Sequence, residues 1–390
     1  MWRCGCFTAV CLVAALASSA CRADAGPVAL SGEPAAEEIA GWVDDLADES
    51  FQVRRRATIQ LTLAGTAAKQ PVLEALASSD PEVRRRARQI LSVLLPQDLT
   101  RRLAEFAAHR DGKTDVDLPG WTRFRQQVGH DEASRNLFVE MMYAEADLLV
   151  AAENAPDEVE AFFMERCTEL RNAMTARDGA ARGEISVGSV AGLYFVATDP
   201  RVTINARWAN YLNAFSAREP FATDVASGAN SQPLRDLITA WFDKGLAADP
   251  NTNYQNIIMA LRLDMPVGLR LAKSLLTKEG QNAMTRPFAM LAIGKFGDRG
   301  DCRLLTPYLE DETPCAGFTR GSRRTTIEVR DVALATLVHL TGRSHAGFGF
   351  TDVVEDPTFL FNLRSLGFDD PRDRIEAIRA WKALDAAEPR

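Results

Sequence analysis

Two arginine triplets are the residues of this sequence whose type and spacing best suit a binding role. They are Arg54–Arg56 and Arg84–Arg86, which lie 30 positions apart. Consecutive side chains fan out around a helix, so each triplet would present cations over a wide arc. A basic stripe of this kind suits an acidic partner, either a peptide or an anionic polysaccharide.

Six arginines are therefore candidate partner-binding residues: Arg54, Arg55, Arg84, Arg85, Arg323 and Arg324. The last two belong to a polar, arginine-containing segment near the C-terminus. An alternative role for the triplets is pairing with acidic neighbours such as Asp48, Glu49 and Asp80. In that case the cations would stabilise the fold and would not bind a partner.

The sequence contains no familiar catalytic or cofactor-binding motif. G-x-G-x-x-G, Walker, G-x-S-x-G and H-E-x-x-H patterns are all absent. Ser189 lies one position too early between Gly188 and Gly192 for a nucleophile elbow. The adjacent pair His130–Asp131 suits a turn followed by a helix cap, and no Cys/His spacing is typical of a zinc site. We therefore predict no catalytic, cofactor-binding or metal-binding residues and no enzyme activity.

The cysteine pattern leaves two alternatives for the folded part of the chain. Four of the seven cysteines precede residue 26 and three follow it, namely Cys167, Cys302 and Cys315. An odd number of cysteines does not form a disulfide framework. Either Cys302 and Cys315 form a bridge in an oxidising compartment, or all three thiols stay unpaired as small apolar groups.

The first 25 residues have the pattern of a signal peptide. Arg3 supplies the positive charge, Phe7 to Ala17 is an apolar run, and Ala23-Asp24-Ala25 is a cleavage signal. The run is shorter than the roughly 20 residues of a membrane span. We expect cleavage before Gly26 and export to the periplasm or beyond the cell. Lipidation of Cys21 is an alternative, and would be the only link to a membrane.

Internal repetition is the strongest feature of the chain. Residues 46–61 and 76–91 are identical at eight of sixteen positions. In both copies three apolar residues recur at i, i+4 and i+8: Val53, Ala57, Leu61 and Val83, Ala87, Leu91. This spacing puts them on one side of a helix. Asp80 and Ser50 are at N-cap positions, and Pro81 is at the first helical position.

The pattern returns near the C-terminus. Val329, Arg330, Ala333 and Leu337 repeat V-R-x-x-A-x-x-x-L, and a degenerate copy begins at Asp370-Pro371. The remaining residues of that second copy are Arg374, Ala377 and Trp381.

These segments resemble a known family of helical repeats. The stretch DPEVRRRA at 80–87 and the L-x-I-G-x-x-G-D pattern at 291–298 are similar to short HEAT-like repeats of the phycobilisome-lyase type. The whole chain resembles exported bacterial HEAT-repeat proteins. The resemblance covers residues 50–95 and 285–385, and implies an all-α fold in which helix pairs stack into an α-solenoid.

We predict three folded regions after the signal peptide 1–25: N-terminal HEAT-like repeats at 35–112, a central helical region at 113–230, and C-terminal HEAT-like helical repeats with loop insertions at 231–390. Within them, four segments have specific expectations. The apolar segment 189–199 is a buried helix or a strand, and its helical neighbours favour the helix. We also expect a linker at 219–232, a loop at 312–327 and irregular structure at 342–368.

The charge balance and the repeats favour a binding protein. The net charge is −8 and the pI about 5.3, which disfavours nucleic acid as a partner. Stacked helix pairs build extended surfaces that suit protein partners. We therefore expect a non-catalytic scaffold for protein–protein interaction. Two alternatives are an enzyme with its site in the central region, residues 114–230, and a structural component of a cell-envelope assembly.

Overall fold

The protein is mostly helical, as expected. The computed structural model describes residues 34–109, 116–175, 185–203, 205–246, 250–277, 284–320 and 323–387. Within these ranges it has 17 α-helices and two short antiparallel sheets of two strands each. The predicted signal peptide, including Cys21, lies outside the described residues. The chain divides into two compact units, the first ending at Thr100 and the second beginning at Arg101.

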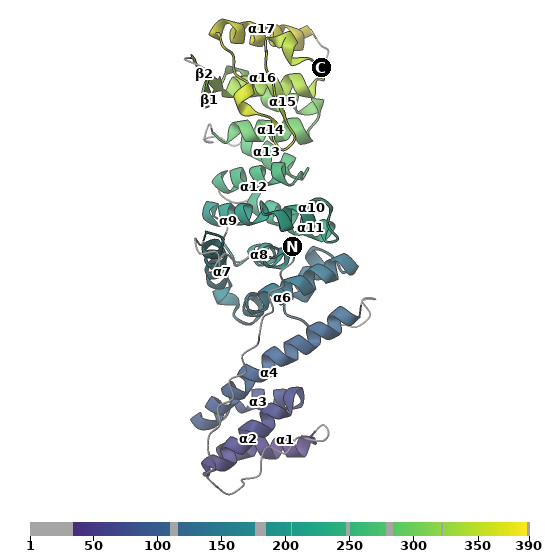
Figure 1. Cartoon of the computed structure of the whole chain (residues 1–390), viewed down its shortest axis with the longest axis vertical. Coiled ribbons are helices and arrows are strands. Elements are labelled where there is room, and N and C mark those ends of the chain that lie inside the picture. The colour runs from purple at the N-terminus through teal and green to yellow at the C-terminus, as the bar shows by residue number, and fades with distance from the viewer. Residues whose placement is uncertain are drawn as a thin grey trace, which may run out of the picture. The chain divides into compact units, whose positions relative to one another are not determined.

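The first unit is built from two helix pairs. Its helices are α1 (Ala36–Asp44), α2 (Phe51–Leu63), α3 (Lys69–Ala75) and the first part of α4 (Pro81–Ala108) (Figure 1). The repeated residues Ala57, Leu61, Ala87 and Leu91 are all buried in one core. The sequence repeat at an offset of 30 therefore marks two structurally equivalent helices, α2 and α4.

Of the two predicted N-cap residues, Asp80 and Ser50, only Asp80 caps its helix through its side chain. Asp80 caps α4, since its Oδ1 accepts the Glu82 N–H at 2.8 Å, and Pro81 is the first helical residue. Ser50 holds the matching N-cap position of α2, but its side chain accepts no capping hydrogen bond. Only its backbone carbonyl takes part, accepting the Arg54 N–H at 3.1 Å.

The second unit contains the central and C-terminal regions together. Its first helices, after the end of α4, are α5 (Trp121–Gln127), α6 (Glu132–Asn154), α7 (Val159–Thr175), α8 (Val187–Ala197), α9 (Ala206–Ser216), α10 (Glu219–Ser227), α11 (Ser231–Leu246) and α12 (Pro250–Arg262). The later elements are α13 (Gly268–Thr277), α14 (Arg286–Phe296), α15 (Cys302–Leu305), β1 (Pro314–Arg320), β2 (Arg323–Glu328), α16 (Val329–Leu340), β3 (Glu355–Asp356), β4 (Leu360–Phe361) and α17 (Pro371–Ala387).

Helix α8 is enclosed by α6, α7, α9, α10 and α11 of the second unit. All its residues from Gly188 to Ala197 are buried, which agrees with the predicted helix at 189–199. A helix that is apolar on every side must be enclosed by neighbours. Two glycines allow this enclosure: a Cβ at Gly188 would lie 2.3 Å from the Glu140 carbonyl oxygen, and one at Gly192 would lie 3.1 Å from Glu145 Cγ. Helices α6 and α8 therefore touch backbone to backbone.

The linker predicted at 219–232 is wrong, because this segment forms α10 and the start of α11. Pro220 lies in the first turn of α10, where its missing N–H costs nothing, and Gly228 is its C-cap. Asn230 is buried and donates to Glu140 at 3.1 Å. The Pro, Gly and Asn residues thus mark helix ends.

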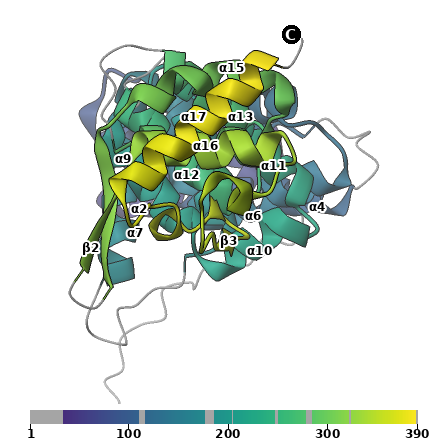
Figure 2. The ribbon, with the colours of Figure 1, turned by 90° about the horizontal axis from the view of Figure 1, so that it is seen from above.

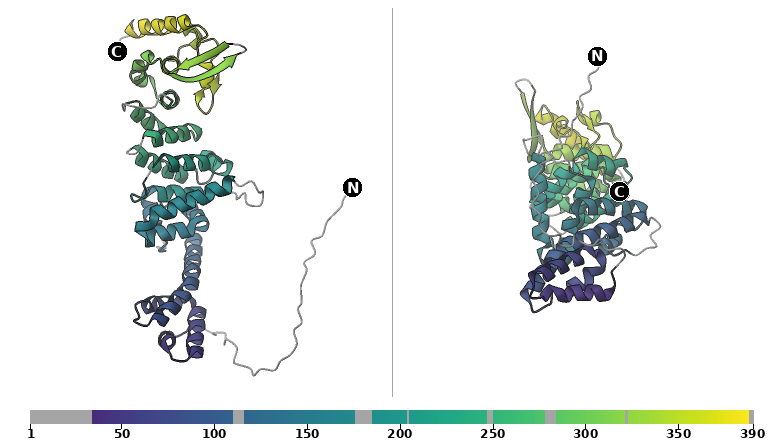
Figure 3. Two further views of the ribbon diagram at one scale, coloured as in Figure 1. Left: turned by 90° about the vertical axis from the view of Figure 1, so that its left-hand side faces the viewer. Right: turned by 60° about the horizontal axis from the view of Figure 1, so that its bottom comes forward.

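The loop predicted at 312–327 is also wrong, because most of it forms the β1–β2 hairpin. The two strands pair antiparallel from Pro314 opposite Glu328 to Arg320 opposite Arg323. Thr325 and Ile327 are buried while Thr326 is exposed, which is the alternation of a strand with one covered face. The hairpin lies beside α17 (Figure 3).

The C-terminal helices pack on one another largely in chain order. Helix α13 packs on α14, α14 on α16, and α17 lies across α16 (Figure 2). The segment 342–368, expected to be irregular, contains only short 3₁₀ turns and two-residue strands. No helix among the described residues is both long and apolar enough to cross a membrane.

The close contact of α6 and α8 yields a stability prediction. We expect Gly188→Ala to lower the free energy of unfolding by about 1–3 kcal/mol, because the new methyl group overpacks a backbone contact. Gly192→Ala should cost less, because its Cβ would lie 3.1 Å from the nearest atom instead of 2.3 Å. Gly41→Ala is the control, since a Cβ there meets nothing within 4 Å. Equal denaturation midpoints for Gly188→Ala and Gly41→Ala would contradict the packing argument.

Candidate partner-binding face

The first arginine of each triplet stabilises its own repeat. Arg54 Nη1 donates to the carbonyl oxygens of Asp48 (2.6 Å) and Glu49 (2.8 Å). Arg84 Nη1 donates to those of Ser78 (2.7 Å) and Ser79 (2.8 Å), at the same two offsets in the second copy. In both copies the guanidinium closes the turn that precedes its helix. Arg54 and Arg84, both predicted as partner-binding residues, thus use these hydrogen bonds within the chain.

The third arginine of the second triplet joins the two copies. Arg86 is buried and donates to Thr58 Oγ1 of α2 at 3.1 Å and to Glu82 at 2.7 Å. Arg85 lies on the outside and also binds Glu82, through two hydrogen bonds of 2.8 and 2.7 Å. The hydrogen bond from Arg85 is the largest cause that lowers the pKa of Glu82 to about 2. Glu82 is therefore ionised and largely neutralised by its arginine neighbours.

An exposed row of side chains runs along the outer side of α2. Phe51, Ile59 and Leu63 are 60 %, 40 % and 55 % exposed. Together with the exposed Arg55 they follow one another at intervals of four residues, which places them on one side of the helix. A helix that buries one side against its own core does not need apolar residues on the other. The structurally equivalent row on α4 includes the exposed residues Arg85 and Val93. We call these two rows together the α2–α4 face.

Several cations on or next to this face have no anion of their own. Arg55, Arg56 and Arg88 are exposed and form no ion pair with any residue that the structure describes. Helix α2 carries three arginines and no acidic residue. The Phe51 ring is flanked by the guanidinium carbons of Arg54 at 6.0 Å and Arg86 at 5.7 Å. The α2–α4 face is thus both apolar and positively charged, in a chain of net charge −8.

The other two candidate arginines, Arg323 and Arg324, lie on strand β2 next to the turn of the hairpin. Their side chains are outside the part that the structure describes. They belong to the second unit, whereas the α2–α4 face is part of the first.

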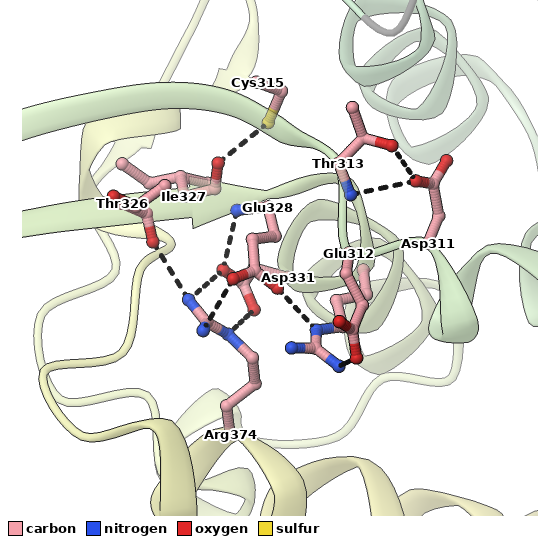
Figure 4. Close-up of polar contacts among 10 residues, drawn as sticks. Asp311, Glu312, Thr313, Cys315, Thr326, Ile327, Glu328, Asp331 and Arg374 are labelled. Atoms are coloured by element: carbon pink, nitrogen blue, oxygen red, sulfur yellow. Dashed lines mark hydrogen bonds and ion pairs between the residues drawn. The ribbon is translucent and has the colours of Figure 1, made fainter.

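A buried ion network beside the hairpin was missed by sequence reasoning (Figure 4). Arg374 of α17 is buried and binds Asp331 through Nε (2.7 Å) and Nη2 (2.9 Å). The same guanidinium donates to Glu328 at 3.0 Å and to the Thr326 carbonyl at 2.9 Å. Arg330 binds the second oxygen of Glu328 at 2.6 Å. Arg374 occupies the repeat position of Arg84, and this match was the signal that could have indicated a structural role.

The remaining residues of chemical interest are structural. Asp131 caps α6 by accepting the Ser134 N–H at 2.8 Å, as predicted for the His130–Asp131 pair. Ser189 is buried in the first turn of α8 and bonds to the capping residue Ser186. No group of three His, Cys, Asp or Glu residues in the described ranges is placed to hold a metal ion.

The three cysteines that the structure describes are free thiols. Cys302 and Cys315 form no disulfide, and of the two alternatives left by the sequence the unpaired one is observed. Cys315 is buried on β1, where its Sγ lies 3.5 Å from the Ile327 carbonyl oxygen, and burial raises the pKa of its thiol to about 12. Cys167 is buried in α7. The two buried thiols are thus held in their protonated form.

Comparison with known proteins gives no relative from which a role for these residues can be transferred. No protein-family model matches the chain, and no curated protein matches its sequence.

The repeated arginine contact predicts unequal effects for the first and the second position of a triplet. Arg84→Ala should lower the free energy of unfolding by about 1–3 kcal/mol, since it removes two charge-assisted hydrogen bonds to carbonyl oxygens. Arg55→Ala, at an exposed position without an ion pair, should stay within about 0.5 kcal/mol of the original chain. Urea denaturation of both variants measures the difference. A larger loss for Arg55→Ala would overturn this assignment.

The network around Arg374 predicts a larger loss. Arg374→Ala leaves the buried Asp331 carboxylate without its partner, and the expected cost is about 3–5 kcal/mol. Arg372→Ala, two residues away and exposed, is the matched control and should be nearly neutral. Thermal unfolding of the two variants provides the comparison, and similar melting temperatures would show that the network contributes little.

Proposed function

We propose that this protein is an exported HEAT-like repeat scaffold that binds an acidic segment of a partner protein on the α2–α4 face. The observation that carries the proposal is the exposed row of Phe51, Ile59 and Leu63 around the unpaired cation Arg55. Exposed apolar side chains beside uncompensated charge are typical of protein-binding surfaces.

A solenoid arrangement is supported by the contacts that recur between copies. The carbonyl clamps of Arg54 and Arg84 are equivalent, and Arg86 of one copy reaches Thr58 of the other. Within the second unit, α12 to α14 and α16 pack in succession. Each helix pair thus depends mainly on its neighbours, which is the organisation of a repeat protein.

The charge and the spacing define the partner. Apolar anchors four residues apart suit the apolar side of an amphipathic segment. Arg55, Arg56 and Arg88 would face carboxylates on that segment, and no acidic residue of α2 opposes them. An acidic amphipathic segment therefore matches both properties, whereas a basic one would be repelled.

Export is supported by the first 25 residues alone, through Arg3, the apolar run and the Ala23–Ala25 cleavage signal. A location outside the cytoplasm would bring the face into contact with exported partners.

Site-specific cross-linking tests this proposal. A photoreactive residue in place of Leu63 should form a reproducible adduct with an acidic segment of one polypeptide in the producing cells. Arg55→Glu together with Arg56→Glu should weaken binding of that partner at least tenfold, or about 1.4 kcal/mol. The affinity of the original chain should also fall with added salt, because the opposing charges are exposed.

Two controls distinguish this outcome from non-specific binding. The same photoreactive residue at Glu74, exposed on α3, should give no such adduct. Arg379→Glu, an exposed charge reversal on α17, should leave the affinity unchanged. Equal yields of the adduct at both positions would refute the proposed role of the face. An affinity that does not change when the charges of residues 55 and 56 are reversed would also refute it.

A further inference from the structure

A hollow in the second unit lies outside the α2–α4 face and the buried ion network. Its volume is about 440 Å³, and it is lined by the start of α5, the second half of α6 and the end of α8. Pockets for small organic molecules usually measure roughly 300–1,000 Å³. The residues that matter for its chemistry are Arg123, Glu153, Leu118, Leu149 and Phe195.

Arg123 contributes a cation that is only partly satisfied. Its guanidinium carbon lies 3.6 Å from the centre of the Phe195 ring. Nη1 donates to the Phe195 carbonyl at 3.0 Å and to Thr198 Oγ1 at 3.3 Å. Nε and Nη2 have no acceptor among the described residues. Burial lowers the pKa of Arg123 to about 10, so the cation lacks full compensation by solvent or anions.

The nearest carboxylate does not neutralise Arg123 by hydrogen bonding. Asp199 is buried and accepts from Arg201, through Nε at 2.7 Å and Nη2 at 2.6 Å. These two bonds lower the pKa of Asp199 and keep it ionised. Arg201 and Asp199 therefore pair through Nε and Nη2 of Arg201, and Nε and Nη2 of Arg123 remain available as donors in the hollow.

An exposed carboxylate also lines the hollow. Glu153 accepts the Gly120 N–H on Oε2 at 2.6 Å, and no described residue donates to its Oε1. Gly120 has φ +81°, and a Cβ there would lie 3.0 Å from the Phe195 ring, so a glycine suits this position. Leu118, Leu149 and Phe195 also line the hollow, with at most 2 % of each residue exposed. The hollow thus offers a cation, an anion and a small amount of apolar surface.

We propose that this hollow binds a small zwitterion that carries a carboxylate, a primary ammonium group and an apolar body, as amino acids and short peptides do. Arg123 would bind the carboxylate through its free N–H groups, which suit a planar carboxylate. Glu153 would bind the ammonium group, and Leu149 and Phe195 would cover the apolar part. A phosphate or other polyanion fits poorly, because Glu153 and Asp117 repel it.

Calorimetry on the full chain with matched probes tests the site. The probes are L-leucine, L-leucyl-L-leucine, its N-acetyl form, its C-terminal amide and inorganic phosphate. We expect L-leucyl-L-leucine or L-leucine to bind, and the comparison of these two sets the preferred length. Blocking either end of the dipeptide should weaken binding at least tenfold, and phosphate should not compete.

Two variants test which residue binds the amino end of the dipeptide and which binds its carboxyl end. In Glu153→Gln, whose amide oxygen can still accept the Gly120 N–H, the N-acetyl form should bind as well as the free dipeptide. In Arg123→Gln, the amide should bind as well as the free acid. Arg379→Gln should bind like the original chain, and circular dichroism should show that all variants are folded. No binding of any probe, or unchanged discrimination in both variants, would overturn the proposal.

Discussion

The end of a helix and the turn that follows it contain main-chain carbonyl groups without an intrahelical donor, and in this protein several cationic side chains bind such carbonyls. The hydrogen bonds of Arg54 and Arg84 to the turns before their own helices are the repeated case. In the second unit Lys244 of α11 donates to the carbonyl of Ala197, the last residue of α8, and to those of Asp199 and Val202, which follow it. Arg135 of α6 does the same for Phe106 and His109 at the end of α4. A chain of many short helices has many such ends, so these contacts hold successive helices together.

This use of cations explains why residue type alone did not predict which arginines are available at the proposed partner-binding face. Of the first triplet, Arg54 is drawn into a turn while Arg55 and Arg56 remain free, although all three are chemically identical. The difference arises from rotation around the helix axis, because only the first arginine points back towards the preceding turn. From the sequence, only acidic side chains were considered as partners of the arginines. The hydrogen-bond acceptors of Arg54 and Arg84 are backbone oxygens, which have no sequence signature.

Local signals were predicted well and non-local ones were not. The 30-residue repeat, the cap at Asp80 and the helix at 189–199 follow from nearby residues, and the structure has them. The β1–β2 hairpin was missed because its alternation is visible only at Thr325 to Ile327, too few residues for a period to stand out. Helix α10 was missed because Pro220 and Gly228 mark helix ends as readily as linkers. Phe51, Ile59 and Leu63 were missed at the candidate face, although their fourfold spacing with Arg55 can be read in the printed sequence.

The link from Arg86 to Thr58 has a consequence for how this part of the chain can change in length. The donor, Arg86, is in the second copy and the acceptor, Thr58, is in the first, whereas the second copy has Arg88 at the position that matches Thr58. The clamp of Arg84 on Ser78 and Ser79 lies wholly inside its own copy. A duplication of the segment from Phe51 to Asp80 would insert a helix with the residues of α2, so Arg86 would still have a threonine before it and the inserted Arg54 would follow the turn of Ser78 and Ser79. An insertion of another length would change the rotation between neighbouring helices and separate Arg86 from its acceptor.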